Sequence, residues 1–184
     1  CQGRPAVVCG STWPADEDII TAYVNAHPDT RKWIIVPHEI GENHIREILS
    51  KCRVPAVRYT DPQADLPAAR VLVIDRIGFL SSVYRYGDIA YVGGGFGKGI
   101  HNTLEAAVYG TPVIFGPRHE KFKEALDLLH CGGAFTIKNK EEFSSLVDSL
   151  LENPTIAHTA GQNALAYVHH QLGATEAIIR QLVD

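Results

Sequence analysis

The chain has 184 residues, of which 45% are hydrophobic and 21% are charged, a composition typical of one globular domain and not of a disordered or low-complexity chain. Seventeen Lys and Arg residues against 21 Asp and Glu residues give a formal net charge of −4, and no basic run is long enough to hold a nucleic-acid backbone. We therefore expect no nucleic-acid partner.

The four cysteines lack Cys-x-x-Cys spacing, and two of them lie in or beside apolar stretches, which indicates free thiols in a reducing compartment. No apolar run approaches the roughly 20 residues that a membrane helix needs, so we expect no transmembrane segment in this chain. Because the chain has no methionine and begins at Cys1, we expect it to be a piece of a longer polypeptide.

Apolar segments of strand length alternate with helical segments, which predicts βαβ units and a parallel sheet. Most of the strand segments are apolar at consecutive positions, so we expect helices on both faces of the sheet. We predict one α/β domain over residues 1–184, with a Rossmann-like, doubly wound parallel sheet. The predicted strands are 6–9, 33–36, 56–59, 71–74, 89–92, 113–115 and 134–137. The predicted helices are 14–27, 42–52, 79–86, 102–109, 121–130, 140–151 and 154–184.

Ligands of such folds bind at the carboxyl ends of the strands, so the loops that follow the strands are the candidate site. The loop at 93–102 has five glycines in seven residues and leads from a strand into a helix. Glycine accepts positive φ and lets a ligand approach the backbone, and a helix N-terminus attracts an anion. The loop matches neither the P-loop nor the Gly-x-Gly-x-x-Gly fingerprint. We interpret it as a phosphate site, the alternative being a bend without a ligand.

Polar residues beside this loop have a structural and a functional interpretation. Asn102 and Glu105 have the spacing of a helix capping box, and spacing alone favours that role over contact with a ligand. His101 could donate to a phosphate or carboxylate oxygen. Ser11 follows the first strand, where a hydroxyl either contacts a ligand or starts a turn.

The other titratable residues predict neither a metal site nor a catalytic base. The histidines lack His-x-His and His-Glu-x-x-His spacing, so we predict no metal. The acidic residues 16–18 are interpreted as a solvated start of the first helix. No Ser-His-Asp or Cys-His arrangement can be argued from the spacing, so we predict no catalytic residue in this chain.

Several segments together carry a resemblance to a known family. They are Gly-Ser-Thr at 10–12, Val-Pro-His at 36–38, Ile-Gly-Phe-Leu at 77–80, His-Asn-Thr-Leu-Glu-Ala-Ala at 101–107 and Gly-Thr-Pro-Val-Ile-Phe-Gly-Pro at 110–117. In this order they resemble the carboxy-terminal half of the bacterial 3-deoxy-D-manno-octulosonic acid (Kdo) transferases, which have the GT-B architecture. The resemblance covers nearly the whole chain.

The resemblance implies the donor-binding half of an inverting glycosyltransferase that moves Kdo from CMP-Kdo to a lipid A precursor in lipopolysaccharide biosynthesis. An amino-terminal domain outside this chain would bind the acceptor and supply the base, so the chain alone is expected to be inactive. The whole enzyme would act at the cytoplasmic face of the inner membrane, with no cofactor. The residues that the resemblance assigns to CMP-Kdo are Ser11, Pro37, His38, Ile77, Gly78, Phe79, Leu80, Gly94, Gly97, Lys98, Gly99, His101, Asn102 and Glu105.

One departure from the family concerns charge. Residues 37–39 are Pro-His-Glu where family members commonly have Pro-Arg-His, so the missing cation would come from Arg76, Lys98 or Arg118. Two alternatives remain open. The chain could be the carboxy-terminal domain of a UDP-sugar transferase or UDP-sugar 2-epimerase, or a non-catalytic nucleotide-binding module.

Overall fold

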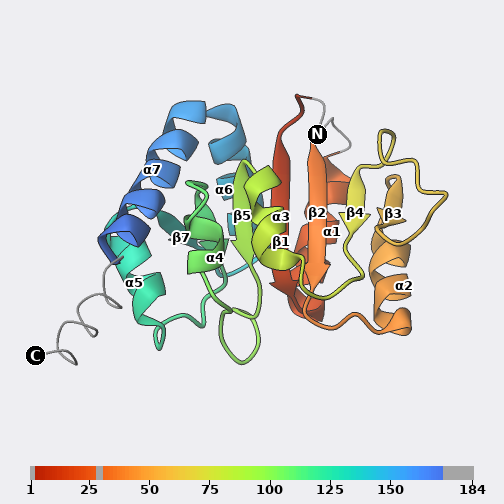
Figure 1. The fold of residues 1–184 in the computed structure, drawn as a ribbon, viewed down its shortest axis with the longest axis horizontal. Helices are drawn as coiled ribbons and strands as arrows, with labels where there is room; N and C mark the ends of the chain where they lie inside the picture. The colour runs from red at the N-terminus through yellow and green to blue at the C-terminus, as the bar shows by residue number, and fades with distance from the viewer. Residues whose placement is uncertain (1–2, 28–30, 172–184) are drawn as a thin grey trace, which may run out of the picture.

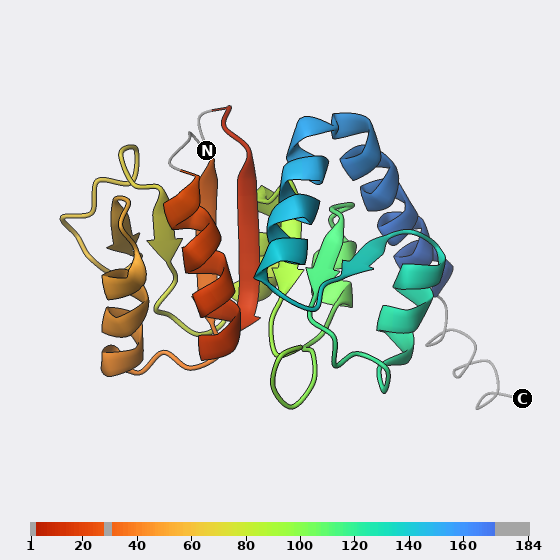
Figure 2. The same ribbon diagram turned by 180° about the vertical axis from the view of Figure 1, so that it is seen from behind.

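The computed structural model describes residues 3–27 and 31–171. These residues form a seven-stranded parallel sheet in the order β3-β4-β2-β1-β5-β6-β7, with helices on both faces (Figures 1 and 2). The predicted α/β class and the doubly wound parallel sheet are therefore confirmed.

The strands lie within a few residues of their predicted positions. They are β1 (Ala6–Thr12), β2 (Lys32–Pro37), β3 (Ala56–Arg58), β4 (Val71–Val73), β5 (Ile89–Val92), β6 (Val113–Phe115) and β7 (Ala134–Thr136). The helices are α1 (Pro14–Ala26), α2 (Glu42–Lys51), α3 (Leu80–Val83), the 3-10 turn η1 (Tyr84–Tyr86), α4 (Leu104–Ala107), α5 (Lys123–His130), α6 (Lys140–Glu152) and α7 (Pro154–Gln171).

Two predicted helices differ from the observed ones. The segment predicted as a helix over 102–109 forms only the four-residue α4, and the segment 79–86 divides into α3 and η1. The predicted terminal helix is confirmed as α7, and its remaining part, 172–184, lies outside the described residues. Among the described helices, none is both long enough and apolar enough to cross a bilayer.

The sheet separates two apolar layers. In β1, Val7 and Cys9 belong to the layer under α1, α2 and α6, while Val8 belongs to the layer under α3, α4, α5 and α7. Successive side chains of a strand point to opposite faces, so a strand that is apolar at every position fills both layers. Figure 2 shows α1 and α6 on one face, and Figure 1 shows α3, α4 and α7 on the other.

Gly10 lets the layer under α3 approach the carboxyl end of β1. A Cβ atom added to Gly10 would lie 2.1 Å from the Tyr84 hydroxyl oxygen and 2.4 Å from Cδ1 of Leu80. Only glycine leaves room for these two side chains. The end of β1 is thus held against the segment that connects β4 to β5.

Candidate functional site

The candidate site lies where β1 and β5 end side by side. The chain leaves β1 toward β2 on one side, while β5 pairs with β1 on the other, so this position is the topological switch point of the sheet. The backbone N–H of Gly93 donates to the carbonyl of Gly10 at 2.9 Å, and the N–H of His38 donates to the carbonyl of Thr12 at 2.9 Å. Loops that are far apart in sequence therefore meet at the edge where the strand arrows end in Figure 1.

Ser11 adopts a backbone conformation that is rare for a residue with a side chain. Its φ of 52° lies in the left-handed region. A Cβ atom on the neighbouring Gly93 would lie 2.3 Å from the carbonyl oxygen of Ser11, so the two backbones are in close contact. Strained backbone of this kind gathers at functional sites.

The glycine-rich loop closes on itself. The N–H groups of Gly97 and Gly99 donate to the Gly94 carbonyl at 2.9 and 3.2 Å, and Gly94 and Gly99 have φ values of 92° and 134°. A Cβ atom on Gly94 would lie 2.3 Å from the carbonyl oxygen of Gly99. Glycines are therefore needed to fold the loop, while Gly97 and Lys98 are exposed at its tip. Since α4 is only four residues long, its N-terminus offers little attraction to an anion.

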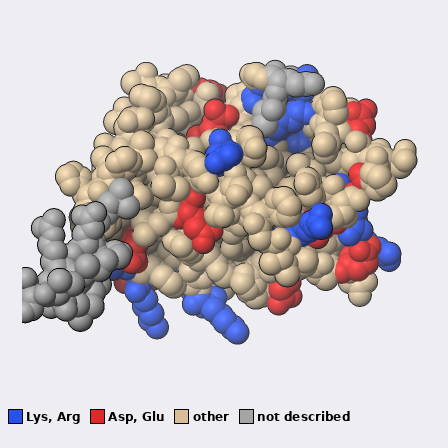
Figure 3. All heavy atoms as spheres, in the orientation of Figure 1, with Lys and Arg blue, Asp and Glu red and all other residues tan. Residues whose placement is uncertain are grey.

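Arg118 supports this loop from the end of β6. Its guanidinium donates to the Gly97 carbonyl at 2.5 Å, and its backbone N–H donates to the Gly95 carbonyl at 3.0 Å. Of the three cations proposed for the missing charge, Arg118 contacts the loop, Lys98 lies exposed on it, and Arg76 is exposed after β4. Figure 3 shows Lys or Arg side chains projecting at the lower edge of the molecule, where the strands end.

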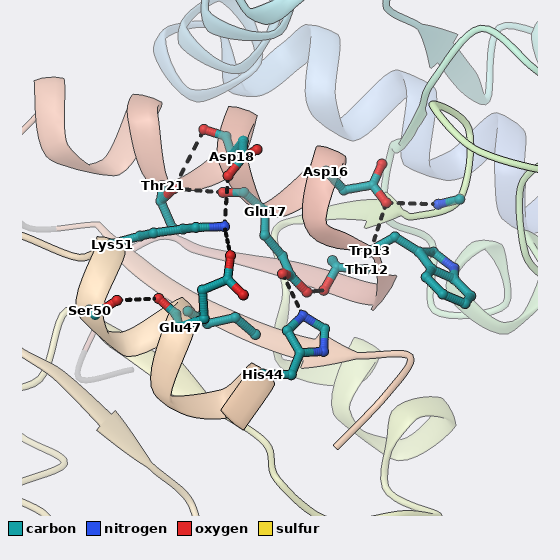
Figure 4. A network of polar contacts seen from close by, with 12 residues as sticks. Thr12, Trp13, Asp16, Glu17, Asp18, Thr21, His44, Glu47, Ser50 and Lys51 are labelled. Atoms are coloured by element: carbon teal, nitrogen blue, oxygen red, sulfur yellow. Dashed lines mark hydrogen bonds and ion pairs between the residues drawn. The ribbon is translucent and has the colours of Figure 1, made fainter. Parts of the chain in front are cut away.

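Asp16 connects the start of α1 to β5 and the glycine loop. Its carboxylate accepts hydrogen bonds from the N–H of Trp13 at 2.9 Å, from the N–H of Gly94 at 2.9 Å and from the hydroxyl of Tyr91 at 2.6 Å. The contacts to Trp13 and to the loop are drawn in Figure 4. Asp16 is only 1% exposed. The carboxylate thus fixes the position of the loop relative to β1.

The interpretation of residues 16–18 as a solvated helix start is wrong for two of the three. Glu17 is also fully buried, and only Asp18 is exposed. Glu17 accepts hydrogen bonds from the Thr12 hydroxyl at 3.0 Å and pairs with Nε2 of His44 on α2 at 2.8 Å (Figure 4). Burial raises the pKa of Glu17, and the contacts with His44 and Thr12 only partly oppose this shift.

Three aromatic rings stack at the end of β1. The ring of His38 lies 4.6 Å from that of Trp13 and 4.5 Å from that of His101, with interplanar angles of 24° and 29°. The indole N–H of Trp13 donates to Nε2 of His101 at 3.1 Å. Burial and the neighbouring His38 lower the pKa of His101, so its neutral form is favoured. The structure therefore brings the predicted residues His38 and His101 together and adds Trp13 to them.

Asn102 and Glu105 interact through their side chains and do not form the predicted capping box. The Asn102 side chain accepts from the N–H of Leu104 at 3.0 Å and donates to the Glu105 carboxylate at 3.2 Å. The residue that precedes α4 is Thr103, which makes no side-chain cap. The negative charge of Glu105 acts on both His101 and Tyr84, so it lies near the candidate site.

The loop after β4 reaches the site only at its end. Ile77 is 82% exposed, Gly78 has a φ of 87°, and the Phe79 ring lies 5.4 Å from that of Tyr59. Leu80 packs at Gly10, beside the candidate site.

The start of this loop is anchored by Asp75. Its carboxylate accepts from the backbone N–H of Thr60 at 3.0 Å and pairs with the Arg58 guanidinium at 2.6 Å. Burial raises the pKa of Asp75, but the hydrogen bonds from Thr60 and Arg58 outweigh it and lower the pKa. Asp75 is therefore a charged anchor for the segment that leads to Phe79.

The predicted residues fall into two groups. Those gathered around the ends of β1 and β5 are Ser11, Pro37, His38, Leu80, Gly94, Gly99, His101, Asn102 and Glu105. Those placed on exposed loop positions or on the loop after β4 are Ile77, Gly78, Phe79, Gly97 and Lys98. Within the described ranges, no three His, Cys, Asp or Glu side chains come together in a group that could hold a metal ion.

Sequence reasoning missed Trp13, Asp16, Glu17 and Tyr91. Trp13 precedes α1, and Asp16 stands three residues later with its carboxylate on the Trp13 N–H. That spacing is the sequence signal that could have revealed Asp16 as a capping residue. Its further bonds to Gly94 and Tyr91 depend on how the strands pair and leave no local signal.

A parallel sheet with a glycine-rich loop at its switch point defines a Rossmann-like nucleotide-binding fold. No family model matches the sequence. Over 176 residues, the chain is 31% identical to the 3-deoxy-D-manno-octulosonic acid transferase of Rickettsia typhi, which covers 91% of this chain and 38% of that protein. The Aquifex aeolicus protein of the same name is 41% identical over 83 residues, or 44% of this chain and 24% of that protein.

Solved structures share the fold of this chain. The C-terminal CMP-Kdo binding domain of WaaA from Acinetobacter baumannii matches with a TM-score of 0.75 and 21% identity, covering 92% of this chain and 89% of that one. HepE of Anabaena, in complex with UDP-glucose, matches with a TM-score of 0.68 and 16% identity, covering 98% of this chain and 49% of that one. The fold is thus that of the carboxy-terminal domains of GT-B glycosyltransferases.

The chain is a homologue of the Kdo transferases, as the resemblance of its segments predicts. It spans 38% of the length of the Rickettsia typhi relative.

Proposed function

We propose that the chain is the donor-binding half of a glycosyltransferase that moves Kdo from CMP-Kdo to a lipid A precursor in lipopolysaccharide biosynthesis. The similarity to Kdo transferases over 91% of the chain carries this proposal. The switch point at the ends of β1 and β5 supports it, because such positions bind nucleotides.

The anionic part of the donor would bind the loops that follow β1 and β5. The glycines of the loop would leave room for a phosphate, and the strained backbone of Ser11 lies against the loop at Gly93. His101 and Asn102 would add side-chain donors, and Glu105 would accept from the ribose hydroxyls. The segment 77–80 would contact the cytosine.

The chemistry requires stabilisation of a leaving group more than proton transfer in this half. Negative charge develops on CMP as the bond to Kdo breaks, and donors that are fixed in advance stabilise it without reorganisation. We propose that a second domain, outside these 184 residues, binds the acceptor and supplies the base for an inverting attack. The whole enzyme would then work at the cytoplasmic face of the inner membrane.

Thermal unfolding with CMP or UDP tests the donor. A ligand at 100 times its Kd stabilises a protein by about 2.7 kcal/mol, which raises the Tm of a domain of this size by roughly 5–10 °C. We expect this rise with CMP and none with UDP at the same concentration. A rise in Tm with UDP alone would indicate a UDP-sugar enzyme instead. A Tm that rises with neither nucleotide would contradict the proposed nucleotide site.

A matched pair of variants locates the binding. Glu105→Gln keeps the side-chain shape at the start of α4 and removes the charge, so CMP affinity should fall. Glu141→Gln makes the same change in the first turn of α6, where the side chain is 70% exposed, and should leave affinity unchanged. Equal CMP affinities of the two variants would indicate that CMP does not bind at α4. Transfer of Kdo by this chain alone would contradict the assignment of the base to another domain.

A further inference from the structure

The indole of Trp13 and the imidazole of His101 come from positions 88 residues apart and meet at 3.1 Å between Nε1 and Nε2. Their relative position is fixed by hydrogen bonds that main-chain N–H groups donate. The same Asp16 carboxylate accepts from the N–H of Trp13 and from the N–H of Gly94, and the N–H of His101 donates to the Gly93 carbonyl at 3.2 Å. The contact is therefore part of the connection between β1 and β5.

The direction of this hydrogen bond decides where the His101 proton lies. An indole N–H is only a donor, so Nε2 of His101 must offer its lone pair. A neutral imidazole carries one proton, which is then on Nδ1. In the part of the chain that the structure describes, no protein group bonds Nδ1 of His101.

The surroundings of His101 keep the ring neutral. Burial and the stacked His38 lower its pKa, and they outweigh the carboxylates of Asp16 and Glu105, which act in the opposite direction. An acidic neighbour close enough to protonate the ring would turn Nε2 into a donor and break the bond to the indole. The bond from Trp13 and the low pKa thus favour the same state.

We propose that Trp13 is a positioning residue whose indole N–H holds His101 as the neutral tautomer with its proton on Nδ1, ready to donate to an oxygen of the bound anion. The donation from His101 to a bound anion rests on the proposed function, whereas the assignment of the tautomer does not. Trp13 acts through His101. Stacking on His38 keeps the indole in the plane that this bond needs.

The chain contains two tryptophans, which supplies a matched control. Trp13→Phe keeps an aromatic ring that can stack and removes the N–H donor. Trp33→Phe makes the same change at a buried residue whose indole nitrogen has no hydrogen-bond partner among the residues that the structure describes. Only the first substitution should affect His101, and circular dichroism establishes that both variants are folded.

Nitrogen-15 NMR of the histidine rings tests the tautomer without any ligand. We expect Nε2 of His101 to resonate as an unprotonated nitrogen in the wild type and in Trp33→Phe. In Trp13→Phe it should shift toward the protonated range as both tautomers become populated, and the pKa of His101 should rise. A protonated Nε2 in the wild type, or an unchanged spectrum in Trp13→Phe, would overturn the proposal.

Calorimetric titration with CMP tests the donation to the anion. Loss of one hydrogen bond to a charged group corresponds to about a tenfold weaker affinity, which we expect in Trp13→Phe and not in Trp33→Phe. Unchanged affinity despite a changed tautomer would refute the donation. If CMP fails to bind the wild type, the proposed function fails, and the NMR result still decides the role of Trp13.

Discussion

Substitution of Asp16 by alanine should destabilise the fold and the site together. The carboxylate accepts three hydrogen bonds, from the N–H groups of Trp13 and Gly94 and from the hydroxyl of Tyr91. Gly94 and Tyr91 are buried, so water cannot replace the acceptor for their donors. Asp16→Ala therefore leaves two buried donors unsatisfied and releases the glycine loop from the start of α1.

The magnitude follows from the number of buried donors. Each unsatisfied buried donor costs about 1–3 kcal/mol, so two of them cost roughly 4 kcal/mol. Asp16→Asn should cost only about 1 kcal/mol, because its carbonyl oxygen still accepts from the two backbone N–H groups. Its NH2 group can then donate to the Tyr91 hydroxyl, since a phenol accepts as well as donates.

Urea unfolding followed by circular dichroism measures both changes. The control is Asp18→Ala on the same helix turn, which removes a 63% exposed carboxylate paired with Lys51 at 2.8 Å. A surface pair of this kind contributes at most about 1 kcal/mol. A cost for Asp16→Ala within about 1 kcal/mol of the control would refute the role of Asp16 as a buried acceptor.

Two further predictions concern close packing and pH. Gly10→Ala would place Cβ 2.1 Å from the Tyr84 hydroxyl oxygen, so it should lower the free energy of unfolding in urea by about 1–3 kcal/mol. Gly41→Ala, where the added Cβ meets no atom within 4 Å, should lower it little. Equal losses in the two variants would contradict the contact at Gly10. Burial raises the Glu17 pKa above its ordinary value of 4.5, so the folded state binds this proton more tightly than the unfolded state. Glu17 therefore destabilises the fold increasingly as the pH rises from about 4.5 toward the pKa of the folded state. Glu17→Gln should remove that part of the decline, and curves of unfolding free energy against pH that stay parallel in the two proteins would show that Glu17 is not its source.

The strands could be predicted because their apolar runs fill two layers, a property of each segment by itself. The end of β1 could not, because Gly10 and Ser11 interrupt the apolar run, while Gly10 and Thr12 are held by pairing with Val36 and Pro37 of β2. The length of α4 could not be predicted from the sequence either. The glycine loop continues through His101, and α4 begins only at Leu104.

The candidate site was predictable where it lies at the carboxyl ends of strands, as for Ser11 near the end of β1 and His101 in the loop after β5. The burial of Asp16 and Glu17 was not, because the local rule for acidic residues in a first turn describes only Asp18 correctly. Their partners come from elsewhere in the sequence, since Gly94 is 78 residues from Asp16 and His44 is 27 residues from Glu17. A prediction made from the sequence of one helix alone cannot show that a carboxylate of that helix contacts a strand from elsewhere in the chain.

The same dependence on strand pairing links stability to binding. The loop of β1 and the loop of β5 are joined by the hydrogen bonds from Gly94 to Asp16 and from Trp13 to His101. A ligand that contacts both loops therefore binds the paired state alone, and its binding free energy adds to the stability of that pairing. Asp16→Ala should accordingly lose CMP affinity as well as stability, whereas Gly41→Ala should lose neither. A variant of Asp16 that binds CMP normally would mean that the ligand contacts only one of the two loops.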